Sequence, residues 1–164
     1  IVERLLKQVW PSGHILTLED SQIKVKRRSG EQAEIVWNQH VNALAWHFEI
    51  RKVRTRVPRG WYCVALQLNQ DDESLALYTL IKPDEAQALP LWQHFEQLIS
   101  RKRPPRKAGD DGPTLKEVTA QEQLWIAEKE RWEVGLEMTP EDFAALLQVL
   151  AKRDLHWLSR AAST

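Results

Sequence analysis

The sequence predicts an α+β protein in which six or seven antiparallel strands come first and helices follow. Between residues 14 and 81, apolar residues alternate with polar ones or form short runs, and turn signals separate these segments. After residue 83 the apolar spacing becomes that of amphipathic helices. A stretch rich in charge, proline and glycine, residues 103–112, then divides the helical part in two.

The strand candidates are bounded by turn residues such as Ser29-Gly30 and Pro58-Arg59-Gly60. WYCVALQL, residues 61–68, is apolar on both faces, which predicts a buried strand. The other expected strands are 14–18, 22–27, 32–37, 40–50 and 74–81, with 51–57 continuing or following the fourth of these.

Two helices are predicted on either side of this strand region. Residues 1–10, IVERLLKQVW, have apolar residues at helical spacing and end at Pro11-Ser12-Gly13. In 84–102, Pro90 either starts the helix or kinks it. One apolar stripe of this second helix would consist of Ala88, Leu91, Trp92, Phe95, Leu98 and Ile99.

The segment beyond the linker is expected to be mainly helical. In 114–132, Leu115, Val118, Trp125 and Trp132 recur about a heptad apart, and a short strand is expected at 134–138. The clearest helix is 139–160, where Thr139 is the N-cap, Pro140 suits the first position and Asp142 can close a capping box. Its expected apolar face is Phe143, Leu146, Leu147, Leu150 and Trp157.

Two segments carry a family resemblance. ILTLEDSQIKVKRRSGEQAEIVWNQHVNALAWHFE resembles the opening of bacterial pleckstrin-homology-like (PH-like) domains of the YcxB-like type, and IVWNQHVNAL corresponds to their strand hallmark. LYTLIKPDEAQALPLWQHFEQLI resembles their final strand and closing helix, although Lys82-Pro83 stands in reverse order. The resemblance covers residues 12–102 and implies a PH-like β-barrel, or orthogonal sandwich, closed by a C-terminal helix.

The expected organisation therefore has four parts. An N-terminal helix at 1–10 precedes a PH-like domain at 12–102, a linker at 103–112 and a helical appendage at 113–164. The resemblance implies a non-enzymatic module. Members of this family commonly follow transmembrane helices and lie on the cytoplasmic side. A chain that opens at Ile1 within IVERLLKQVW is what a chain cut just after a membrane span would look like.

Composition excludes several kinds of site. With one cysteine, Cys63, the chain has no internal disulfide and no multi-cysteine zinc site. It lacks a His-x-x-x-His pair, a Gly-x-Ser-x-Gly motif and a phosphate-binding glycine loop. No catalytic residue, metal or cofactor is therefore expected, and Cys63 is interpreted as an inert core residue.

Net charge is zero, but residues 1–108 hold 17 Lys and Arg against 12 Asp and Glu, and residues 109–164 hold 6 against 11. Basic residues alternate in two strand segments, so each set would share one face. The first interpretation is a solvated strand face that discourages edge pairing. The second is a surface for anionic lipid headgroups. The candidate residues are Lys24, Lys26 and Arg28 in one segment and Lys52, Arg54 and Arg56 in the other.

The sequence thus favours a non-catalytic interaction module over an enzyme. We expect the cytosolic domain of a membrane protein that presents a basic surface to anionic lipid headgroups or to a partner protein. Without upstream spans, it would be cytoplasmic. The alternative is a soluble oligomeric scaffold, a homo-oligomer assembled through the C-terminal helices. Nucleic acid is disfavoured, because stacking needs exposed aromatics among the positive charges.

Overall fold

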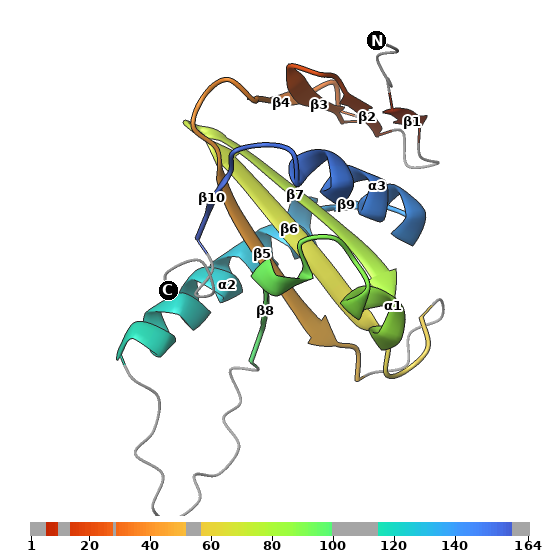
Figure 1. Ribbon diagram of the computed structural model, residues 1–164, viewed down its shortest axis with the longest axis vertical. Helices are drawn as coiled ribbons and strands as arrows, with labels where there is room; N and C mark the ends of the chain where they lie inside the picture. The colour runs from red at the N-terminus through yellow and green to blue at the C-terminus, as the bar shows by residue number, and fades with distance from the viewer. Residues whose placement is uncertain (1–5, 10–13, 28, 52–56, 100–114, 159–164) are drawn as a thin grey trace, which may run out of the picture.

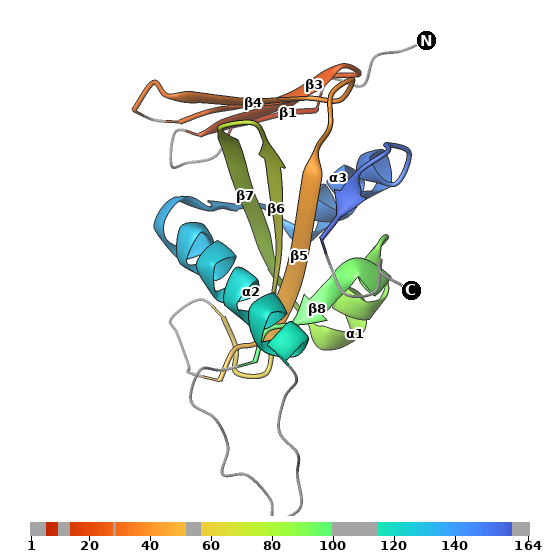
Figure 2. The ribbon, with the colours of Figure 1, turned by 90° about the vertical axis from the view of Figure 1, so that its left-hand side faces the viewer.

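The computed structural model describes residues 6–9, 14–27, 29–51, 57–99 and 115–158. Within them the chain is α+β, with two sheets and three helices (Figure 1). The first sheet, called sheet A, lies crosswise over one end of the second, called sheet B (Figure 2).

Sheet A is antiparallel and follows chain order. Its outer strand β1 pairs Leu6 with Leu18 and Val9 with Ile15. From β2 to β4 the side chains alternate between the interior and solvent, which is the pattern of a sheet with one buried face. The strands are β1 (Leu6–Val9), β2 (Ile15–Leu18), β3 (Gln22–Lys26) and β4 (Gln32–Val36).

Sheet B is mixed. Its centre is an antiparallel meander of three long strands: β5 (Asn42–Glu49), β6 (Tyr62–Gln70) and β7 (Glu73–Ile81). Shorter strands run parallel to its two outer members: β8 (Phe95–Gln97) and β10 (His156–Trp157) on β5, and β9 (Leu136–Glu137) on β7.

The helices lie on opposite faces of this meander. Helix α2 (Leu115–Val134) crosses one face obliquely, while α1 (Pro83–Gln87) and α3 (Pro140–Leu150) lie on the other (Figure 2). As predicted, Thr139 caps α3: its hydroxyl accepts from the Asp142 N–H at 3.3 Å and donates to the Asp142 carboxylate at 2.7 Å.

The main core fills the space between sheet A, α3 and the first face of sheet B. Side chains from all three meet there in one buried cluster, which includes Ile23, Leu66 and Phe143. Gln70 joins the sheets at their edge, because its amide accepts from the Val36 N–H at 2.8 Å and donates to the Val36 carbonyl at 2.7 Å. A side chain thus replaces the strand partner that β4 would otherwise need at Val36.

The strand positions predicted from the sequence are confirmed for 14–18, 22–27, 32–37, 40–50, 61–68 and 74–81, with shifts of one or two residues at their ends. The α+β class is confirmed, but the predicted closed barrel is wrong: the two sheets do not close on one another. The PH-like fold remains a prediction.

The expected closing helix at 84–102 is also wrong. Helix α1 stops at Gln87, a 3-10 turn follows at Trp92–His94, and β8 begins at Phe95. Pro90 lacks the N–H that a helix needs, and the next residue, Leu91, takes a left-handed conformation with φ 61°. The helix that packs between the two sheets is α3 instead.

Two other helical expectations are corrected. In the predicted N-terminal helix at 1–10, the described residues 6–9 form strand β1. A segment this short gains little from helical hydrogen bonds alone, whereas pairing with β2 satisfies its backbone. The predicted helix at 139–160 ends at Leu150, and His156–Trp157 extends sheet B.

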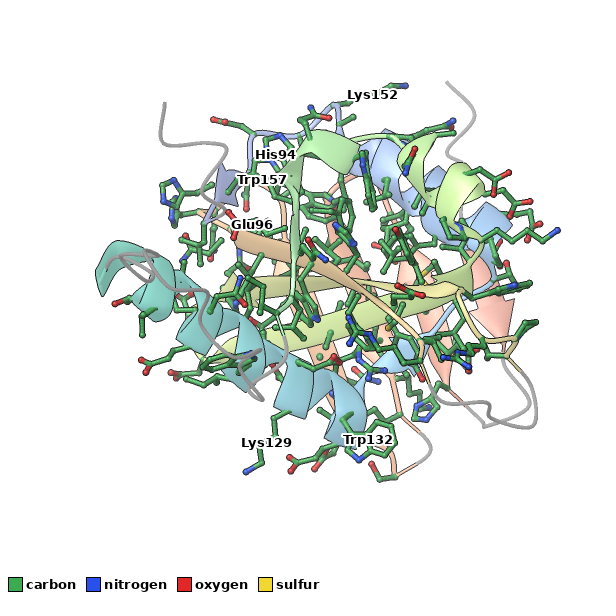
Figure 3. All side chains as sticks on the ribbon, turned by 90° about the horizontal axis from the view of Figure 1, so that it is seen from below. His94, Glu96, Lys129, Trp132, Lys152 and Trp157 are labelled. Atoms are coloured by element: carbon green, nitrogen blue, oxygen red, sulfur yellow. The ribbon has the colours of Figure 1, made fainter. Side chains whose placement is uncertain are left out.

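The expected helical appendage at 113–164 packs directly on the strand region. Besides α2 and α3, it contributes β9 and β10 to opposite sides of the meander. Trp157 on β10 stacks on His94, with 4.2 Å between the ring centroids, and the two lie together at one side of the molecule (Figure 3). The proposed linker at 103–112 lies outside the described residues.

Candidate functional site: a groove beside helix α2

Helix α2 covers only part of the second face of sheet B. Cross-strand partners form rows on this face. The row Trp46–Ala65–Tyr78 packs against Leu124 and Ala127 of α2. The neighbouring row, Phe48–Cys63–Leu80, is the floor of a groove that runs beside the helix.

The groove has walls from three parts of the chain and a volume of about 1180 Å³. It is lined by the flank of α2, by Glu49–Arg51 with Val57, and by residues 97–99. Large apolar side chains on its rim are open to solvent: Ile99 is 53% exposed, Ile126 70% and Trp132 63%. Exposed apolar side chains gathered at one hollow are typical of a binding surface.

Residues 97–99 are fastened to α2 by hydrogen bonds. The Gln121 amide accepts from the Ile99 N–H at 3.0 Å and donates to the Gln97 carbonyl at 3.1 Å. The Trp125 indole N–H donates to the Ile99 carbonyl at 2.8 Å. These bonds fix residues 97–99, which line the groove, against α2.

A buried ion pair lies in the groove wall. Arg131 is 8% exposed, and its Nε donates to the carboxylate of Glu128 one turn earlier on α2. The Arg131 guanidinium carbon lies 4.6 Å from the ring centroid of Tyr78, 5.7 Å from that of Phe48 and 5.9 Å from that of Trp132. These distances are those of cation–π contacts.

Burial dominates the protonation chemistry here. It raises the pKa of the Glu128 carboxyl, and the nearby Arg131 offsets this only in part. Trp46 also favours the Glu128 carboxylate, although its buried indole N–H lacks a partner at hydrogen-bond geometry. Burial raises the pKa of the Cys63 thiol to about 12, so the thiol on the groove floor is neutral near pH 7 and a poor nucleophile.

Of the basic residues singled out from the sequence, the structure describes two. Lys24 and Lys26 share the outward face of β3, with Lys24 half-buried and Lys26 exposed. Glu34 on β4 is the direct cross-strand partner of Lys24, so this face carries both signs of charge. Arg28, Lys52, Arg54 and Arg56 lie outside the described residues.

Sequence reasoning missed the groove because it placed the stripe of α2 one residue away from the side chains that are buried. Leu124, Ala127 and Arg131 face the sheet, whereas Trp132, expected to seal the C-terminal part, faces solvent. Figure 3 shows Trp132 and Lys129 projecting from α2 on the same side of the molecule. Two features of the sequence could have indicated the inward face of α2. One is the i, i+3, i+7 spacing of Leu124, Ala127 and Arg131, and the other is the charged Arg131 within that stripe.

Glu128 and Glu130 of α2 both have contacts on the inner side of the helix. Glu130 accepts hydrogen bonds from Gln67 on β6 and, at 3.0 Å, from Ser74 on β7. Among the described residues, no group of His, Cys, Asp and Glu is arranged to hold a metal ion. In that same part of the chain, no helix has the length and apolar character needed to cross a membrane.

Comparisons with family models, curated proteins and solved structures give no match to this chain.

Proposed function

We propose that this chain is a non-catalytic interaction module that docks an amphipathic helix of a partner protein in the groove beside α2. The observation that carries the proposal is the row Phe48–Cys63–Leu80, which lines the groove beside α2 and is flanked by the exposed Ile126 and Trp132. An apolar sheet face is normally covered by helices, and α2 leaves room for a second one at its side. Helix-in-groove docking is a common mode of peptide recognition.

Charge favours a protein partner over an anionic bilayer. Helix α2 carries five acidic residues against Lys116, Lys129 and Arg131, and the acidic residues Glu122 and Glu133 are exposed. The outer side of α2, away from the groove lining, is therefore repelled by the anionic headgroups of a bilayer. A helix seated in the groove would contact mainly Phe48, Leu80 and Trp132.

Selection from a displayed library of helix-forming peptides of about 15 residues tests this proposal. The chain is the target, and selected peptides are remeasured by calorimetry. We expect the double variant Ile126→Ser/Trp132→Ser to weaken binding at least about tenfold, since each side chain loses apolar burial. The control is Leu158→Ser, because Leu158 is 41% exposed but does not line the groove.

Two outcomes would oppose the docking proposal. One is a failure to enrich any peptide, and the other is equal binding by the groove variant and the control. The basic-surface function is tested in parallel by sedimentation with vesicles of phosphatidylcholine and phosphatidylserine. Binding that is lost in Lys24→Glu/Lys26→Glu but kept in the groove variant would favour lipid headgroups instead.

Oligomerisation through the C-terminal helices is the second candidate, favoured by the exposure of Ile126 and Trp132 on α2. Sedimentation equilibrium separates it from docking of another protein. A dimer that dissociates in Ile126→Ser/Trp132→Ser, with no peptide enriched, would assign the groove to a second copy of this chain.

A further inference from the structure

An ion pair, Glu128–Arg131, lies on the inner side of α2, where apolar side chains are expected. Its neighbours Leu124 and Ala127 are buried and apolar, and the floor beneath it is Phe48, Cys63 and Tyr78. Removing two charges from water is costly, and apolar side chains of similar volume often stabilise a protein as well or better. Stability alone therefore gives no reason for a charge at this position of the helix.

The guanidinium of Arg131 is held in a fixed orientation. Its central carbon lies over the Tyr78 ring, and its Nε donates to both carboxylate oxygens of Glu128, at 3.2 Å to the farther one. A guanidinium has five N–H donors, and Glu128 engages the one on Nε. Among the residues that the structure describes, no other acceptor bonds to Arg131, which itself lines the groove.

We infer that Arg131 recognises a carboxylate on the helix that docks in the groove, an Asp or Glu placed among that helix's apolar residues. The two Nη groups of an arginine can donate two parallel hydrogen bonds to the oxygens of one carboxylate. Arg131 would then bridge Glu128 and the incoming carboxylate. The inference rests on the proposed function and adds the chemistry that selects the partner.

The other charges at the groove agree in sign with an acidic ligand. Arg51, Lys129 and Arg131 line it against Glu49 and Glu128, an excess of one positive charge among the described lining residues. Tyr78 and Phe48 exclude water from one side of the guanidinium, and a hydrogen-bonded charge pair is stronger where water is excluded. The wrong partner, with an apolar residue at this position, would leave the donors of Arg131 unsatisfied.

The test uses peptides enriched by the full chain from the displayed library. We expect them to share one Asp or Glu within an apolar helical stripe. Changing that acid to its amide should weaken binding to the unaltered chain at least about 30-fold, the lower end of the range for truncating one partner of a buried charge pair. The same change should leave binding to Arg131→Met unaffected, because the coupling needs both groups.

Glu128→Gln supplies a second variant that keeps the guanidinium. It removes the internal competitor for Arg131, so acidic peptides should bind more tightly to it and their amide versions should not. Circular dichroism of each variant establishes that it is folded, and the amide peptides test the unaltered chain even if Arg131→Met does not fold.

Selected peptides that lack a shared acid, or an amide that binds as well as the acid, would overturn the inference. If those peptides still lose affinity in Ile126→Ser/Trp132→Ser, groove docking stands and only the carboxylate recognition fails. If they bind this double variant normally, the proposed function itself fails.

Discussion

The two faces of the β5–β6–β7 meander come from the same strands but are covered in different ways. On the first face, sheet A and α3 bury a continuous apolar cluster in which Leu66, Leu77 and Phe143 are inaccessible to solvent. On the second face, α2 buries a small cluster around Trp46 and leaves the row Phe48–Cys63–Leu80 as the floor of a groove. Stability is therefore expected to depend mainly on the first face and binding on the second.

The largest effect is expected from Phe143→Ala on the first face. Phe143 is completely buried between α3 and the sheets, and a large cavity there should cost about 3–5 kcal/mol of unfolding free energy. Leu124→Ala makes the matched change under α2. Urea unfolding followed by circular dichroism compares the two, and a larger loss for Leu124→Ala would reverse our assignment of the faces.

A smaller effect is expected from the ion pair on the second face. Arg131→Met leaves the Glu128 carboxyl without its partner and should cost about 1–3 kcal/mol, because Glu128 can respond by taking up a proton. The double variant Glu128→Leu/Arg131→Met should recover most of that loss. If urea unfolding shows the double variant to be less stable than Arg131→Met, then the ion pair stabilises the fold. The pair would then not be a net cost to stability.

A pH effect should arise at the edge of the first face, where His47 packs between Tyr62 and Trp92 at centroid distances of 5.4 and 4.6 Å. Burial lowers the pKa of His47 and of His94, so folding favours their neutral forms. Their contribution to the unfolding free energy should be fully present above the unfolded-state pKa of about 6.5. It should be lost as the pH falls below that value through the lower folded-state pKa values.

Thermal unfolding between about pH 7.5 and pH 5 measures this dependence. His47→Gln should flatten it in part, and so should His94→Gln. A melting temperature that rises on acidification over this interval would contradict the predicted sign.

The smallest effect on stability is expected at the rim of the groove. Trp132 is 63% exposed and its main described contact is the cation–π contact with Arg131, so Trp132→Ser should change the unfolding free energy by no more than about 1 kcal/mol. The same substitution should weaken peptide binding several-fold. Calorimetry and urea unfolding of one preparation give both quantities, and a large loss of stability would mean that the two faces are not separable in this way.

The strands could be predicted from the sequence because each has its own turn residues and its own alternation, as in Gln22–Lys26. The segment 84–102 could not, because its helical spacing competes with Pro90 and with pairing of Phe95–Gln97 to β5, a contact distant in sequence. The short strand expected at 134–138 is confirmed as β9, whereas β10 has only two residues and no local signal of its own.

The candidate site was harder to predict. The heptad-like spacing of Trp125 and Trp132 suggested a buried stripe, but the residues that face the sheet are offset from it by one position. Successive residues of a helix point about 100° apart. A stripe predicted one position away from the true one therefore assigns exposed side chains to the buried face. The alternating Lys24 and Lys26 were correctly expected on one face, yet no pattern within β3 indicates Glu34 beside Lys24.

The cluster between the sheets contains Leu16 from β2 and Leu150 from the end of α3. During synthesis the ribosome delivers the first of these long before the second. Until α3 emerges from the ribosome, one apolar face of the β5–β6–β7 meander is still partly uncovered. That face is then exposed to other nascent chains and to chaperones. The core is therefore completed late in synthesis. A nascent chain stalled on the ribosome before Leu150 would expose an aggregation-prone sheet.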